Sequence, residues 1–137
     1  MVAALPEYYF RTRENGAFVF RIEQETRQRQ IEMEQIAVVN IRNGEVKPHG
    51  DRDLTDEDLA RIDAWMAERR AILAERTLDD IRRTVDHLNQ TAHWVQTRAG
   101  DDEIEAVTND LLLAMHDLRQ VLVRKRADRV MKERAAG

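Results

Sequence analysis

The chain has 137 residues, of which 42% are hydrophobic and 35% charged, a composition that supports one ordinary core and excludes disorder of the whole chain. It contains no cysteine, which excludes disulfide bonds, a thiol nucleophile and thiolate metal sites. The sequence has no stretch of about 18 apolar residues, and residues 1–6 lack the basic and apolar regions of a secretory signal. We therefore expect a cytoplasmic protein that does not span a membrane.

The net charge of −4 conceals an uneven distribution of charge along the chain. Residues 1–50 hold seven acidic and seven basic side chains, and residues 51–117 hold 17 acidic and eight basic. Residues 118–137 hold two acidic and seven basic side chains, so an acidic middle precedes a basic end. Such asymmetry can mark a nucleic-acid-binding tail or serve head-to-tail pairing of helices, and it suggests a partner without naming one.

The first predicted elements are two strands within residues 8–22, joined around Asn15-Gly16, a dipeptide typical of β-hairpin turns. A two-residue turn of Asn15 and Gly16 would pair Phe10 with Arg21 and divide the large apolar side chains between both faces. A three-residue loop with Gly16 in the left-handed conformation would pair Phe10 with Phe20 and gather these side chains on one face, so we prefer it. The opposite face would then carry Tyr9, Arg11, Arg13, Val19, Arg21 and Glu23.

Two further strands are expected after a polar stretch at residues 24–30. Residues 31–41 begin with alternating apolar and polar side chains and end in a continuous apolar run, which predicts a third strand. Asn43-Gly44 indicates a second hairpin turn, followed by a short strand that Pro48 would end at a sheet edge. We therefore expect a meander of three or four antiparallel strands over residues 8–47.

Helical signals occupy the rest of the chain. Thr55 can cap a helix whose first turn is acidic, where carboxylates favour the positive end of the helix dipole. No proline follows, and Gly100 is the only glycine before the last residue, so a break is expected near residues 98–102. Residues 55–98 should form one helix, continuous or gently kinked, or two helices with a new start at Thr77. We prefer the continuous form, with a C-terminal helix at residues 101–134.

The expected fold is a single α+β domain over residues 1–137. It would consist of an N-terminal three- or four-stranded antiparallel β-meander followed by a long α-helical hairpin with a coiled-coil-like seam. Apolar side chains recur at alternating spacings of three and four on both sides of Gly100, as in helices that pack along a seam. The two runs are Leu78, Ile81, Val85, Leu88, Ala92 and Val95, and then Ile104, Val107, Leu111, Ala114, Leu118 and Val121.

An antiparallel hairpin with this seam would bring specific pairs of residues into contact. It would place Leu88 beside Leu111, Val85 beside Ala114 and Ile81 beside Leu118. Other apolar residues lie off the seam, some before Thr77 and some in a second stripe on the last helix. A single partner helix cannot cover both the seam and this second stripe. The last helix should therefore also contact the sheet or another subunit. The candidate interface residues are Trp65, Met66, Leu112, Met115 and Leu122.

The sequence predicts no catalytic residue, no cofactor and no metal site. The four histidines, His49, His87, His93 and His116, lack the Glu-x-x-His or His-x-x-x-His spacing that puts two ligands on one helical face. Three of four carboxylate clusters lie at expected helix starts, where capping and the dipole account for them. Glycine-rich phosphate loops and nucleophile motifs are absent from the sequence.

The basic end is the only concentrated cationic feature. Phosphate binding would use such a cluster, but cations are also favoured at a helix C-terminus, and the acidic segment before it would repel a polyanion. The candidate nucleic-acid-binding residues are Arg124, Lys125, Arg126, Arg129 and Lys132.

Together these patterns favour a non-enzymatic interaction or regulatory module that self-associates through its helices, as a dimer in the simplest case. A protein partner of another kind is compatible with the same surfaces. One alternative is a nucleic-acid-associated protein that uses the basic C-terminal helix. A second alternative is an enzyme or small-ligand binder whose site comes from residues scattered along the sequence.

Overall fold

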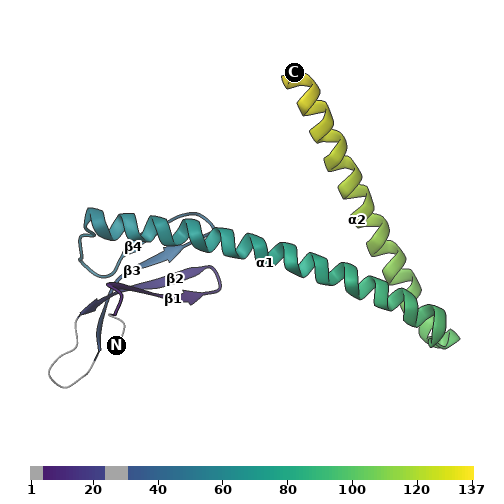
Figure 1. Ribbon diagram of the computed structural model, residues 1–137, viewed down its shortest axis with the longest axis horizontal. Coiled ribbons are helices and arrows are strands. Elements are labelled where there is room, and N and C mark those ends of the chain that lie inside the picture. The colour runs from purple at the N-terminus through teal and green to yellow at the C-terminus, as the bar shows by residue number, and fades with distance from the viewer. Residues whose placement is uncertain (1–4, 24–30) are drawn as a thin grey trace. The chain divides into compact units, whose positions relative to one another are not determined.

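The computed structural model describes residues 5–23 and 31–137, and the polar stretch expected at residues 24–30 lies outside the described residues. Within these ranges the predicted α+β class is confirmed, with an N-terminal antiparallel meander followed by a helical hairpin (Figure 1). The elements are β1 (Tyr8–Arg13), β2 (Gly16–Glu23), β3 (Glu32–Asn40), β4 (Val46–Pro48), α1 (Asp56–Thr97) and α2 (Asp101–Ala136).

The chain divides into two compact units, and their boundary falls inside α1. The sheet unit ends at Asp80 and holds the four strands described with the first part of α1. The helical unit, Ile81–Gly137, holds the rest of α1 and all of α2. Because α1 is continuous, the alternative of a second helix starting at Thr77 is wrong. The apolar side chains nevertheless change their phase on α1 near Thr77, close to the boundary between the units. A single domain over residues 1–137 stays a prediction.

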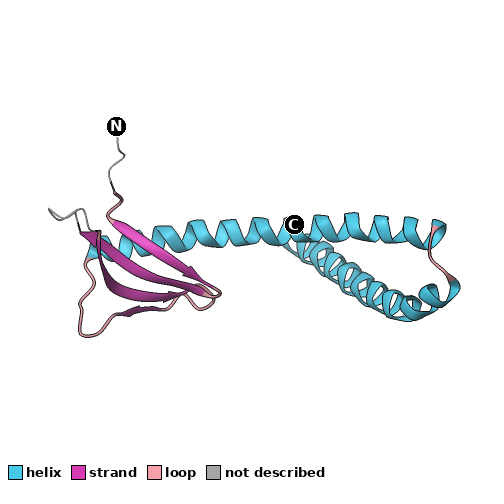
Figure 2. Cartoon of the chain, turned by 90° about the horizontal axis from the view of Figure 1, so that it is seen from below, coloured by secondary structure: helices cyan, strands magenta, loops and turns pink. Residues whose placement is uncertain are grey.

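The core of the sheet unit lies between the sheet and the first part of α1. The strands follow one another in the order β1-β2-β3-β4, all antiparallel, and they lie along one side of the helix (Figure 2). Val19 of β2 and Ile36 of β3 are fully enclosed, and from α1 Ile62 is fully buried and Met66 is 6% exposed. Ile62 and Met66 are four residues apart, so they lie on one face of the helix. The sheet therefore covers that face of α1.

The register of the first hairpin differs from both registers considered from the sequence. Arg13 pairs with Gly16, and the turn consists of Glu14 and Asn15, so Phe10 pairs with Val19. Gly16 is the first residue of β2 and is not among the described glycines with positive φ. A Cβ atom on Gly16 would overlap the carbonyl oxygen of Val39, so this position needs glycine for close approach between strands.

This register changes which side chains face the helix. Val19, expected on the outer face, belongs to the core, and Phe20 belongs with Tyr9 on the other face, where their ring centroids are 6.2 Å apart. On that face the Arg11 guanidinium lies 4.7 Å from the centroid of Phe20. The Arg13 guanidinium lies 4.6 Å from the centroid of Phe18 in the same way. The expectation of a single apolar face is therefore wrong, because arginines cover the outer aromatic rings by cation–π contact.

Replacing Gly16 with alanine tests this register. We expect Gly16→Ala to lower the free energy of unfolding by roughly 3 kcal/mol, the upper part of the range for overpacking, because the new methyl group meets main-chain atoms that cannot rotate away. Gly100→Ala is the matched control, since Gly100 has φ −79° and the nearest atom to its added Cβ is a side-chain oxygen at 3.5 Å. The control should lose less than about 1 kcal/mol. Equal effects of the two substitutions in urea unfolding would contradict the register.

Candidate interaction surface

The turn between the helices is built around Gly100. The N–H groups of Arg98 and Ala99 both donate to the carbonyl oxygen of Trp94 at 2.9 Å, which closes the end of α1. The N–H of Gly100 then donates to a carboxylate oxygen of Glu103 at 3.1 Å, and its own carbonyl accepts the N–H of Ile104 at 3.0 Å. These bonds satisfy main-chain groups at both helix ends, so the chain reverses over a short connection. The break expected at this glycine is confirmed.

Beside this turn the two helices of the helical unit form an apolar groove of about 370 Å³. Leu88 of α1 and Leu111 of α2 line it together and are half-buried, as the predicted seam requires. The other residues around the groove are Thr91, Ala92, Val95, Gln96, Val107, Thr108, Leu112 and Met115. The groove is therefore bounded by apolar side chains with a few small polar groups, an environment suited to an apolar side chain.

Farther from the turn the seam does not close. Ile81 is 55% exposed, Val85 is 53% exposed and Leu118 is 57% exposed, so the expected contacts of Ile81 with Leu118 and of Val85 with Ala114 bury none of these large side chains. Within the helical unit α2 diverges from α1 away from the turn (Figure 1). The structure describes every residue of α2 and finds none of them buried.

The second stripe of α2 is also uncovered. Leu112 is 60% exposed, Met115 is 51% exposed and Leu122 is 61% exposed, although the first two line the groove as well. A folded monomer rarely leaves such a continuous set of large apolar side chains in water, and exposed patches of this kind mark interaction sites. α2 is thus the main candidate surface in the described part of the chain.

The other two expected interface residues are used inside the sheet unit. Met66 is buried in the core, and the ring of Trp65 stacks on Phe10 with centroids 4.9 Å apart and an angle of 2° between the planes. Placing Met66 at an interface between subunits is therefore wrong, because the chain's own sheet covers that face of α1. Trp65 is half-buried by the same contact.

The basic end remains on the surface. Arg124, Lys125, Arg126, Arg129 and Lys132 all belong to α2 and are exposed. Arg129 donates to Glu133 at 3.1 Å, one turn later in the helix, and both side chains are largely in solvent. An exposed pair of this kind contributes only about 0.2–1 kcal/mol and can exchange partners readily.

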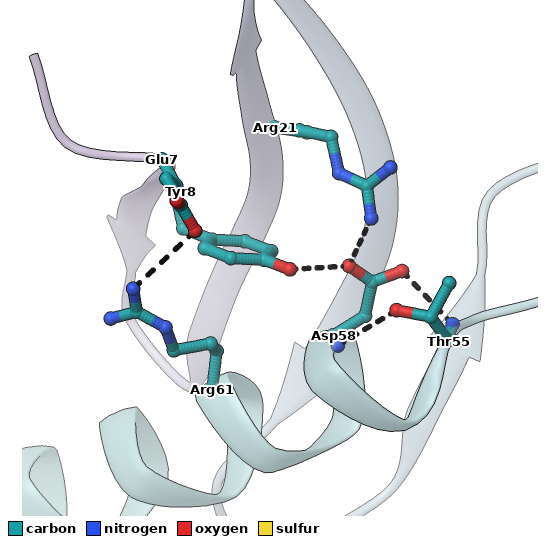
Figure 3. A network of polar contacts seen from close by, with 6 residues as sticks. All are labelled: Glu7, Tyr8, Arg21, Thr55, Asp58 and Arg61. Atoms are coloured by element: carbon teal, nitrogen blue, oxygen red, sulfur yellow. Dashed lines mark hydrogen bonds and ion pairs between the residues drawn. The ribbon is translucent and has the colours of Figure 1, made fainter.

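A buried polar network joins β1, β2 and the start of α1, and it centres on Asp58 (Figure 3). Oδ1 of Asp58 accepts the hydroxyl of Tyr8 at 2.6 Å and the guanidinium of Arg21 at 2.5 Å. Oδ2 accepts the N–H of Thr55 at 3.0 Å, and the Thr55 hydroxyl accepts the N–H of Asp58 at 3.0 Å, a reciprocal helix cap. Beside it the Arg61 guanidinium lies 5.3 Å from the Tyr8 ring centroid.

The hydrogen bonds of this network decide the protonation of Asp58. Burial alone would raise the pKa of its carboxyl group, but bonds from Tyr8, from Thr55 and from Arg21 outweigh burial and hold the pKa at about 2. Burial and the bond to Asp58 raise the pKa of the Tyr8 phenol. A carboxylate with both oxygens engaged and a low pKa is a poor general base near neutral pH. The network therefore stabilises the fold and is not a candidate for acid–base catalysis.

Only part of this network is predictable from the sequence. The sequence predicts Thr55 as a cap and accounts for Asp58 by the helix dipole. The spacing of the two residues is also the signature of a capping box, which would predict the reciprocal bond from the Thr55 N–H to Asp58. Arg21, expected on the outer face, lies instead on the face toward α1, because the observed register turns it toward Asp58. No sequence signal gives that contact, since Arg21 and Asp58 are 37 residues apart.

None of the four histidines is buried: His49, His87, His93 and His116 are all exposed. Across residues 5–23 and 31–137 no three histidine or acidic side chains come together in a way that could hold a metal ion. Neither α1 nor α2, both fully described, has an apolar stretch long enough to cross a lipid bilayer.

Comparison of the chain with protein families, with characterised proteins and with solved structures finds no match in any of the three. The candidate surface therefore rests on the geometry of this chain.

Acid unfolding tests the role of Asp58. Its pKa in the folded protein is about 2, below the ordinary 3.8, so its contribution to stability is complete above about pH 5 and is lost as the pH falls through 3.8 to about 2. We expect roughly 2 kcal/mol of the free energy of unfolding to disappear over this window because of this group. Urea unfolding of the wild type and of Asp58→Asn at several pH values measures it. The variant should start less stable and lack this part of the pH dependence.

Asp56→Asn provides the control for this measurement. Asp56 lies in the same first turn of α1 but is exposed, so its loss should cost less than about 1 kcal/mol through the helix dipole. If Asp56→Asn and Asp58→Asn change the acid transition equally, the network is not its source.

Proposed function

We propose that this chain is a non-enzymatic interaction or regulatory module that assembles with a second copy of itself through the helices of the helical unit. The observation that carries the proposal is the exposure of large apolar side chains along α2, of which Leu112, Leu118 and Leu122 are each more than half exposed. Covering such side chains in a dimer removes apolar surface from water and stabilises the assembly.

Burial of these side chains favours assembly over exposure to water. Full burial of one leucine side chain contributes about 1.5–3 kcal/mol, and a symmetric dimer buries each position twice. A few such positions are enough to offset the translational and rotational entropy lost on association. The sheet already covers the face of α1 that carries Ile62 and Met66, so this face offers no such surface to a second copy.

The other functions considered have less support. The basic end lies on α2, but it follows an acidic half of the same helix, which opposes binding of a polyanion. The buried carboxylate of Asp58 is engaged by Tyr8, Arg21 and Thr55, so it offers nothing to a substrate. We also propose a cytoplasmic location, for which the cysteine-free sequence is the support.

Sedimentation equilibrium at micromolar concentration tests the proposal. The wild type should show about twice the 16.0 kDa of the chain. Leu122→Asp should raise the dissociation constant at least about 100-fold, since each dimer loses two leucine contacts of about 1.5–3 kcal/mol. Circular dichroism of the monomer should show that the sheet unit and helices persist.

The matched control is Leu113→Asp. Leu113 is 69% exposed, slightly more than Leu122, but its position in the helix turns it about 100° away from Leu112 and thus away from the second stripe. The control should leave the dissociation constant within about threefold, which corresponds to less than 1 kcal/mol. A wild type that stays monomeric over the whole range would overturn the proposal, and retention on heparin would then favour nucleic acid instead.

A further inference from the structure

We infer that the second copy approaches α2 in the antiparallel direction, and that Leu122 of each copy enters the apolar groove of the other. This inference rests on the proposed function and adds the orientation, the register and the occupant of the groove. Three features of the described helical unit support it: the distribution of charge along α2, the spacing of its second stripe, and the position of the groove.

Charge is strongly polarised along α2. Residues 101–117 hold six acidic and no basic side chains, whereas residues 119–134 hold seven basic and two acidic. Two parallel helices would place acid against acid and base against base over their whole length. Two antiparallel helices place the acidic half of each beside the basic half of the other, and complementary charge of this kind fixes the orientation of a complex.

The second stripe continues beyond its three apolar residues in both directions. Positions at alternating spacings of four and three lie on one side of a helix and form a seam along which another helix can pack. On α2 this row is acidic first, mostly apolar in the middle and basic at Arg126 and Arg129, before it ends at Glu133. Its members are Asp101, Glu105, Thr108, Leu112, Met115, Arg119, Leu122, Arg126, Arg129 and Glu133.

With Glu133 included, the row is centred midway between Met115 and Arg119. When two copies run antiparallel and are superposed at this point, Leu112 of one copy lies opposite Leu122 of the other. The same register places Glu105 opposite Arg129, whose bond to Glu133 is exposed and can exchange. A two-fold axis generates each of these contacts twice, as a closed dimer requires.

The groove between α1 and α2 can accommodate Leu122 of the second copy. Leu112 lines the groove of about 370 Å³ beside the turn, together with Leu88, Val95 and Leu111. In the antiparallel register Leu122 of the second copy lies next to Leu112 and so at this groove. A parallel register would instead place the second copy's Leu112 there and leave Leu122, which is 61% exposed, against the other copy's Leu122 and far from either groove.

Disulfide cross-linking tests the orientation. The chain has no cysteine, so each disulfide that forms involves only the engineered thiols. The full-length variants Leu112→Cys and Leu122→Cys are oxidised separately and as a one-to-one mixture with copper phenanthroline. The antiparallel register predicts that the mixed disulfide forms at least tenfold faster than either homodimer. The off-stripe pair Leu113→Cys and Val121→Cys is the matched control, since it has the same sum of positions but lies away from the row, and its mixture should show no such preference.

Sedimentation of each reduced variant separates failure of the orientation from failure of the assembly. A dimeric mass with rapid homodimer disulfides at Leu112→Cys and Leu122→Cys alone overturns the antiparallel orientation and leaves the proposed function intact. A dimeric mass with no preference over the off-stripe pair overturns this surface as the contact. A monomeric wild type overturns the proposed function, and this inference with it.

Discussion

The contact of Asp58 with Tyr8 and Arg21 sets how α1 lies on the sheet. It joins the first residue of β1, an inner position of β2 and the third residue of α1, and the Thr55 cap fixes the same carboxylate from the helix side. Once Asp58 is held, the residues four and eight positions later are Ile62 and Met66, which must then face the sheet. One polar contact therefore determines which apolar face of α1 enters the core.

Beyond the sheet unit, α1 presents a different apolar face. In the sheet unit the core face follows Asp58, Ile62 and Met66, whereas in the helical unit the apolar row passes through Val85 and Leu88 on another phase. The change lies near Thr77, close to the boundary between the units. A continuous helix with two apolar phases thus belongs to two units and contributes a different surface to each.

The sequence predicted the order and type of the elements because strand alternation, capping residues and a lone Gly100 are local signals. It did not predict the hairpin register, which depends on the space beside Gly16 that only the packed third strand defines. The contact of Arg21 with Asp58 depends on that register, so the sequence did not predict it either. The residues of the second stripe are exposed, and their role as an interface stays a prediction. The predicted seam stays open beyond Leu88 because the helices diverge, which no local pattern in the sequence indicates.

In the dimer that we propose, affinity and orientation have separate sources on α2. Exposed ion pairs each contribute about 0.2–1 kcal/mol, and salt screens them within about 8–10 Å, so the charged halves cannot hold a dimer together by themselves. The leucines between them can supply several kcal/mol, but apolar contact is non-directional and would accept either orientation. The charges need only disfavour the parallel arrangement, where six acidic side chains of one copy would lie along six of the other. In the proposed dimer, the apolar middle of α2 would therefore supply the strength of pairing, and its oppositely charged ends would supply the direction.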